Sequence, residues 1–181
     1  GIFSAFLGPE IAVTAKDWLS SPYGYAGSFL FLSGLFIIAM VLMLGFKNPE
    51  IKFSDNDGEI RPLSVIIKQP IFIIAILSAA IGFALMSYLM TATPLSMYQL
   101  HGHSLNDTKW VIQSHIAAMF IPSLFTALLV KRIGLKNLML AGTLIYTVVT
   151  VIALSGEQVM HYWWALVLLG IGWNFLFVGG T

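Results

Sequence analysis

The sequence predicts an all-α fold, a bundle of membrane-spanning helices, and two observations carry that prediction. Charged residues make up only 9% of the 181 residues and hydrophobic residues 58%, whereas about a quarter of a soluble domain is charged. The charged residues are also confined to short islands. Because about 20 apolar residues in a helix cross the hydrocarbon core, each of the five runs between the islands is long enough for one crossing. The five runs without Asp, Glu, Lys or Arg are 18–46, 69–106, 110–130, 137–156 and 158–181.

Helix is the expected structure of every span, because hydrocarbon offers the backbone no water to bond. A membrane β-barrel would need short alternating strands, and these runs are uniformly apolar. A very apolar soluble bundle would need a polar shell that the composition does not supply. We therefore expect about five full spans plus part of another. The six segments are 1–14, 24–46, 70–90 with an extension to 97 left open, 108–130, 137–155 and 162–181.

The basic residues of the loops predict the orientation, since cytoplasmic loops are enriched in Lys and Arg. Loops 47–69 and 131–136 hold seven of these residues against two on the other side, so both loops are expected in the cytoplasm. On that orientation four tryptophans fall at outer span ends, as in an aromatic belt. The seven are Lys47, Lys52, Arg61, Lys68, Lys131, Arg132 and Lys136, the two are Lys16 and Lys109, and the tryptophans are Trp18, Trp110, Trp163 and Trp164.

Three segments together resemble the major facilitator superfamily of secondary transporters. Residues 4–12 (SAFLGPEIA), with Gly8 and Pro9, resemble the Gly-Pro motif at the outer end of the family's fifth helix. Residues 127–137 (ALLVKRIGLKN) resemble the inner loop after the eighth helix, and residues 170–175 (GIGWNF) resemble part of the tenth. In the inner loop Ala127 stands where the family has Gly and Lys131 where it has Asp, so a gating salt bridge on that Asp is not expected.

The resemblance implies a domain division and a fragment of a twelve-helix fold. Residues 1–46 correspond to helices five and six at the end of the N-terminal half. Residues 47–69 form a cytoplasmic central loop, and residues 70–181 hold helices seven to ten of the C-terminal half. The chain begins with Gly rather than Met and stops within an apolar run, which fits an incomplete bundle. The localisation implied is the bacterial inner (plasma) membrane.

Polar residues inside the spans are the candidates for a substrate path, because polar groups in spans usually face the bundle interior. Tyr88, Trp110, Gln113 and Asn174 offer amide groups and aromatic rings to an organic solute. Trp110 and Gln113 are three residues apart and share a helix face. The alternative is that the amides hold helices together, which contributes about 1 kcal/mol per bond in membranes.

His115 and Glu10 are the candidates for proton coupling. A histidine titrates near physiological pH and can relay a proton, but it can equally be a neutral residue that bonds two helices together. Gln113 and His115 are two residues apart, about 200° around a helix, so they point in different directions. Glu10 follows Gly8 and Pro9, and it can be either protonatable in function or simply placed at the outer water interface.

The inner-loop residues Lys131, Arg132 and Gly134 are expected to anchor the cytoplasmic end of the bundle, with Gly134 permitting a tight turn. We expect no metal site and no cofactor. The chain has no Cys, and His101-Gly102-His103 lacks a close third histidine. Nucleic acid is not an expected partner, because the net charge of +1 comes without a basic stripe.

The predicted function is therefore secondary active transport of a small organic solute by a permease with alternating access, coupled to protons and embedded in the lipid bilayer. Two other functions stay open. A membrane-embedded enzyme would need clustered His, Asp or Glu within the spans, which the spans lack, so we expect no enzyme. The second open function is that of a sensor that has the same fold but does not transport a solute.

The orientation predicts which residues a membrane-impermeant thiol reagent reaches from outside the cell. In the whole protein, Asn106→Cys is expected to be labelled from outside, because it lies beyond an outer span end. Asn137→Cys is expected to be labelled only after the membrane is permeabilised. Labelling in the reverse pattern would contradict the seven-to-two loop argument.

Overall fold

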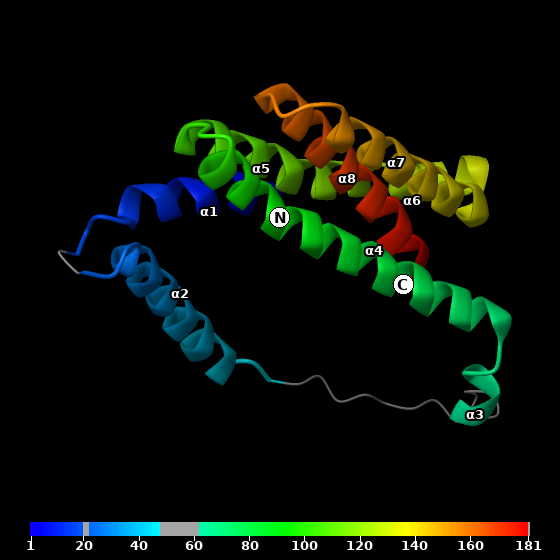
Figure 1. Ribbon diagram of the computed structural model, residues 1–181. Coiled ribbons are helices and arrows are strands. Elements are labelled where there is room, and N and C mark those ends of the chain that lie inside the picture. Colours follow the sequence, from blue (N-terminus) through cyan, green and yellow to red (C-terminus); the bar gives the residue numbers. More distant parts are fainter. Residues whose placement is uncertain (20–21, 48–61, 181) are drawn as a thin grey trace. The chain divides into compact units, whose positions relative to one another are not determined.

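The computed structural model describes residues 1–19, 22–47 and 62–180, and in those ranges all regular structure is helical (Figure 1). The prediction of an all-α fold is confirmed. Most of the predicted cytoplasmic loop 47–69, with Lys52 and Arg61, lies outside the described residues. The helices are α1 (Ile2–Ala15), α2 (Ala26–Leu44), α3 (Leu63–Ile66), α4 (Pro70–Leu95), the π-helix η1 (Ser96–Leu100), α5 (Leu105–Phe120), the 3₁₀-helix η2 (Ile121–Leu124), α6 (Thr126–Ile133), α7 (Leu135–Ser155) and α8 (Val159–Gly180).

Four of the described helices are long and apolar enough to cross a membrane. These are α2, α4 with its continuation η1, α7 and α8. The helices α5 with η2 and α6 are apolar and long enough together to form a fifth span. They meet at a bend of 57°, so they count as one crossing only if the bent pair is a single span. The third predicted span thus continues beyond residue 97 to Leu100, and the fourth, 108–130, is interrupted.

The interruption of the fourth span lies between Leu124 and Thr126, shortly after Pro122, and the chemistry of proline explains it. Proline has no backbone N–H, and its ring clashes with the carbonyl one turn earlier, so it breaks or kinks a helix. Here the α-helix changes to the 3₁₀-helix η2 at Ile121, and α6 begins at Thr126. Such a break is tolerated in a span only where side chains or neighbouring helices bond the freed backbone groups.

The chain divides into two compact units, Gly1–Pro9 with Ile67–Thr181 and Glu10–Ile66. In the second unit α2 packs closely on the end of α1. The Ser28 hydroxyl donates to the Ala12 carbonyl at 2.6 Å, and the ring of Trp18 lies edge-on to Phe31 with centroids 6.1 Å apart. Gly27 lies so near the Ala15 carbonyl that a Cβ there would overlap it.

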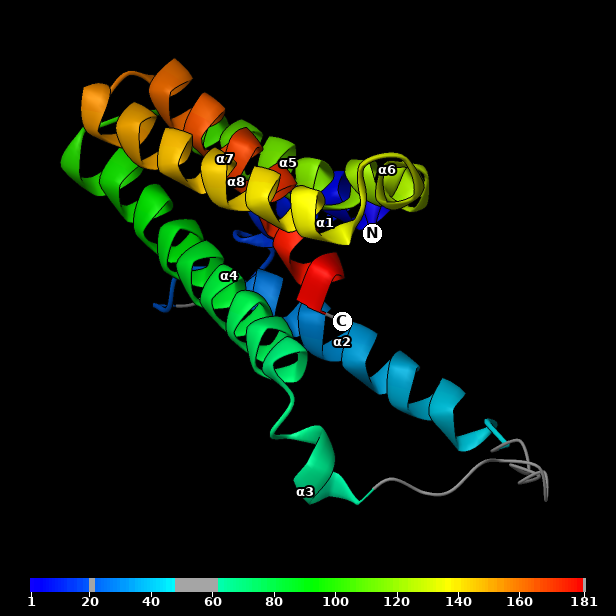
Figure 2. The same cartoon turned by 90° about the vertical axis from the view of Figure 1, so that its right-hand side faces the viewer.

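In the first unit α8 lies at the centre and packs against α4, α5 and α7 (Figures 1 and 2). Glycine makes this close approach possible. A Cβ on Gly170 would lie 2.7 Å from the His115 carbonyl oxygen of α5, and a Cβ on Gly172 would lie 2.8 Å from the Tyr146 ring of α7. Helices in lipid associate through such small-residue contacts, so α8 fixes how α5 and α7 are placed.

Candidate functional site

A tryptophan cluster lies where α5 and α8 begin, at the same end of the first unit. The rings of Trp110 and Trp163 are stacked, with centroids 5.4 Å apart and planes 12° apart. Trp164 meets Trp163 edge-on at 4.7 Å. The Trp163 indole N–H donates to the Ser114 hydroxyl at 2.9 Å, one turn beyond Trp110 on α5. The pair is therefore held from both helices.

Behind this cluster lies a dry core that supports it. Met97, Val111 and Leu166 are buried together, and Tyr162 and Trp163 pack against them. Met97 comes from η1, Val111 from α5 and Leu166 from α8, so three elements converge under the tryptophans. The Trp163 ring consequently has little freedom, whereas Trp110 remains 43% exposed.

Gln113 lies one turn from Trp110 on α5 and reaches α1. Its Nε2 donates to the Phe6 carbonyl at 3.0 Å, and Phe6 belongs to the segment of α1 that packs in the first unit. An amide can make up to four hydrogen bonds, so this one bond leaves capacity for a ligand. Trp110 and Gln113 together place an aromatic ring and an amide at the start of α5.

Asn174 on α8 lies directly against the bend at Pro122. Its Nδ2 donates to the Met119 carbonyl at 2.9 Å and to the Ser123 hydroxyl at 2.6 Å. The Thr126 hydroxyl lies 3.1 Å from Asn174 Oδ1 and 2.8 Å from the Pro122 carbonyl. Asn174 is 2% exposed. The arrangement bonds the polar groups of an interrupted helix to a side chain of its neighbour.

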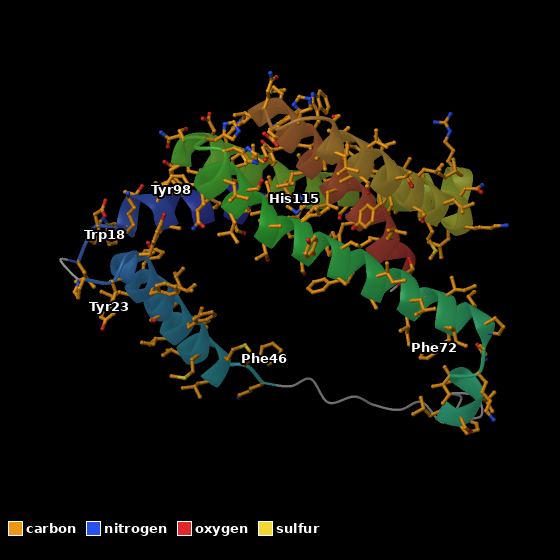
Figure 3. The ribbon with its side chains drawn as sticks, in the orientation of Figure 1. Trp18, Tyr23, Phe46, Phe72, Tyr98 and His115 are labelled. Carbon is orange, nitrogen blue, oxygen red and sulfur yellow. The ribbon has the colours of Figure 1, made fainter. Side chains whose placement is uncertain are left out.

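His115 is fully buried between α5 and α8 (Figure 3). Its Nδ1 lies 2.7 Å from the Leu166 carbonyl oxygen, which can only accept, so Nδ1 carries the proton. Nε2 is then an acceptor, and among the described residues it has no hydrogen-bond partner. His115 and Gln113 thus bond to different helices, α8 and α1.

Tyr88 and Glu10 belong to other elements. Tyr88 on α4 is 70% exposed. Glu10 lies in the second unit on α1, directly after Gly8 and Pro9, which are both inside that helix. The fold therefore brings Trp110 and Gln113 together on α5 and places Asn174 and Tyr88 elsewhere.

The inner-loop residues form a very short connection between α6 and α7. Lys131 and Arg132 are exposed in the last turn of α6, where cations interact favourably with the helix dipole. Gly134 alone separates the two helices and has φ of 82°. An L-residue with a side chain would be strained at that angle, so the glycine permits the reversal.

At the tryptophan end a second polar cluster joins the end of η1 to the turn between α7 and α8. His101 Nδ1 lies 3.0 Å from a Glu157 carboxylate oxygen, and His103 Nε2 lies 2.7 Å from the Glu157 carbonyl oxygen. Tyr162 and Ser96 share a hydrogen bond of 2.8 Å. Within the described ranges, no three His, Asp or Glu side chains are grouped to hold a metal ion.

An apolar groove of about 1030 Å³ runs between α4, α7 and α8. It is lined from α8 by Leu169, Leu176 and Gly179, toward the end of α8 opposite Trp163. Tyr146 contributes a hydroxyl to the lining, but this group already donates to the Gly82 carbonyl at 2.9 Å. None of the predicted substrate-path residues lines the groove.

Two features of the site were not predicted from the sequence. Trp163 was expected at an outer span end, and the bond from its N–H to Ser114 was not predicted. The grouping of Ser123 and Thr126 with Asn174 was also missed, since these residues lie about 50 positions apart in the chain. Pro122 was the available signal, because a break in a span implies that a neighbouring helix bonds the freed groups.

Comparison with known proteins gives a consistent result. The sequence model of the Major Facilitator Superfamily matches residues 1–181. The riboflavin transporter RfnT of Brucella anthropi is 36% identical over 183 residues, which cover 100% of this chain and 46% of that protein. The uncharacterized MFS-type transporter YddS of Bacillus subtilis is 31% identical over 98% of this chain and 44% of its own length. The chain thus spans about half the length of these relatives. No solved structure matches it.

The geometry at the bend predicts that Asn174 stabilises the whole protein. Asn174→Ala removes the donor that bonds the Met119 carbonyl and the Ser123 hydroxyl, which costs about 1–2 kcal/mol. We expect a lower melting temperature in lipid nanodiscs. The matched control is Asn106→Ala, an exposed asparagine, for which no change is expected. Equal melting temperatures for the two variants would contradict this role of Asn174.

Proposed function

The chain belongs to the Major Facilitator Superfamily, and on that premise we propose that the whole protein is a secondary active transporter of a small organic solute. The family assignment confirms the resemblance seen in residues 4–12, 127–137 and 170–175, and it makes the protein an integral membrane protein. The observation that carries the proposal is the match along the entire chain to a protein named as a transporter. The relatives are named as transporters rather than enzymes, which favours transport over catalysis.

We propose riboflavin, or a solute with a similar planar ring system, as the first substrate to test. The name of the relative from Brucella anthropi supplies this candidate. The start of α5 supports it, because Trp110 offers an aromatic face and Gln113 an amide to the same solute. Tyr88 and Asn174 remain proposed members of the substrate path. For Asn174 this requires that the bonds at the bend exchange for bonds to the solute.

The mechanism proposed is alternating access, driven by protons. His115 and Glu10 are the proposed proton-linked residues. Within the part of the chain that the structure describes, Nε2 of His115 has no hydrogen-bond partner, which supports this role, since a protonated Nε2 would need an acceptor that a proton relay could supply. Lys131 and Arg132, held by the turn at Gly134, are proposed to interact with neighbouring inner loops. The bacterial relatives favour the bacterial inner membrane, with residues 47–69 and 131–136 in the cytoplasm.

Uptake by the whole purified protein in liposomes tests the proposal. Riboflavin is expected to accumulate when an inward proton gradient is imposed and to equilibrate more slowly without one. Liposomes that contain no protein give the background rate. Uptake at the background rate in both conditions would exclude riboflavin transport, and uptake that is equal with and without the gradient would exclude proton coupling alone.

Gln113→Ala distinguishes a substrate-path residue from one that only links two helices. We expect the apparent KM for riboflavin to rise several-fold, because one amide contact typically contributes about 1 kcal/mol, while the melting temperature stays near that of the wild type. Gln158→Ala, an exposed glutamine before α8, is the matched control and should change neither quantity. A lowered melting temperature with unchanged kinetics would assign Gln113 to the contact with Phe6 instead.

A further inference from the structure

The stacked tryptophans at the start of α5 and α8 have a geometry that an aromatic belt does not require. Belt tryptophans place the ring in the interface and direct the polar N–H to water or lipid headgroups. Trp163 instead directs its N–H to Ser114 at 2.9 Å. Its ring is fixed between the dry core of Met97, Val111 and Leu166 and the Trp110 ring. Contacts within the protein therefore hold the orientation of this pair.

Part of this pair is exposed. Trp163 covers one side of the Trp110 ring at a plane angle of 12°, yet Trp110 remains 43% exposed. Trp110 therefore keeps accessible side-chain surface. A third flat ring that stacks on Trp110 would extend the existing stack. Gln113, one turn along the same helix face, is then placed for the polar edge of such a ring.

We propose that the Trp110–Trp163 pair is a preformed stacking platform for the planar heteroaromatic ring of the transported solute, with Gln113 bonding the edge of that ring. This inference rests on the proposed function and deepens it, because it names the part of the substrate that is recognised and the residues that recognise it. Stacking on an aromatic side chain selects flat rings with little regard to their substituents. The platform therefore recognises the ring system and not a sugar-like chain attached to it.

The platform makes a specific prediction for binding to the whole protein in nanodiscs, with riboflavin as the probe. Trp110→Leu removes the stacking face but keeps an apolar side chain, and we expect the Kd to rise about tenfold. Trp110→Phe keeps a smaller aromatic face, so its Kd for riboflavin should rise less than that of Trp110→Leu. Trp18→Leu, at an exposed tryptophan of the second unit, is the matched control and should leave the Kd unchanged.

Competitors separate recognition of the ring from recognition of the chain. Lumichrome, which has the ring system without the ribityl chain, should displace riboflavin from the wild type, and ribitol should not. Displacement by ribitol and not by lumichrome would overturn the platform. Wild-type protein that does not bind riboflavin would overturn the proposed substrate together with the platform. Wild-type binding that Trp110→Leu leaves unchanged would overturn the platform alone.

A measurement on the wild type covers the case in which Trp110→Leu fails to fold. Hydroxyl-radical oxidation read by mass spectrometry reports the exposure of each tryptophan. Bound riboflavin should lower the oxidation of Trp110 relative to that of Trp18, which serves as an internal reference for radical scavenging. An unchanged ratio of the two at saturating riboflavin would overturn the proposal.

Discussion

The first unit depends on one constraint: an interrupted helix in hydrocarbon must find hydrogen-bond partners in a neighbouring helix. Pro122 lies in η2, and a bend of 57° follows between Leu124 and Thr126. At this break, Asn174 of α8 donates hydrogen bonds to the Met119 carbonyl and the Ser123 hydroxyl. The Thr126 hydroxyl donates to the side-chain oxygen of Asn174. Without that amide the Met119 carbonyl and the Ser123 hydroxyl would lose these bonds, and unbonded polar groups are costly inside a membrane.

The same helix, α8, also positions the candidate site. Gly170 lets it approach the backbone of α5 at His115, and the Leu166 carbonyl then accepts from His115. Near its start Trp163 stacks on Trp110 and bonds Ser114. The close approach at Gly170, the bond from Asn174 to Met119 and the stacked tryptophans are thus three contacts between α5 and α8. The bend and the proposed substrate platform are therefore both held by side chains of α8.

The fold class followed from the sequence because span length and charge placement are local properties. The charge-free runs predicted helices where α2, α4, α7 and α8 lie. The fourth predicted span, 108–130, corresponds to α5, η2 and α6, and its bend was not predicted, since composition alone does not fix whether Pro122 kinks a helix or ends it. Sequence also indicated that Gln113 and His115 point apart, because helix geometry requires it. The partners of Asn174 and Trp163 could not be derived, because they depend on how α5 packs against α8 over a separation of about 50 residues.

The most direct test of this account is an experimental structure of the whole protein in lipid, at a resolution that shows side chains. The account predicts a bend near 57° between α5 and α6, with Asn174 Nδ2 within hydrogen-bond distance of the Met119 carbonyl oxygen. A continuous straight helix through Pro122, with the Asn174 amide bonded elsewhere, would contradict it.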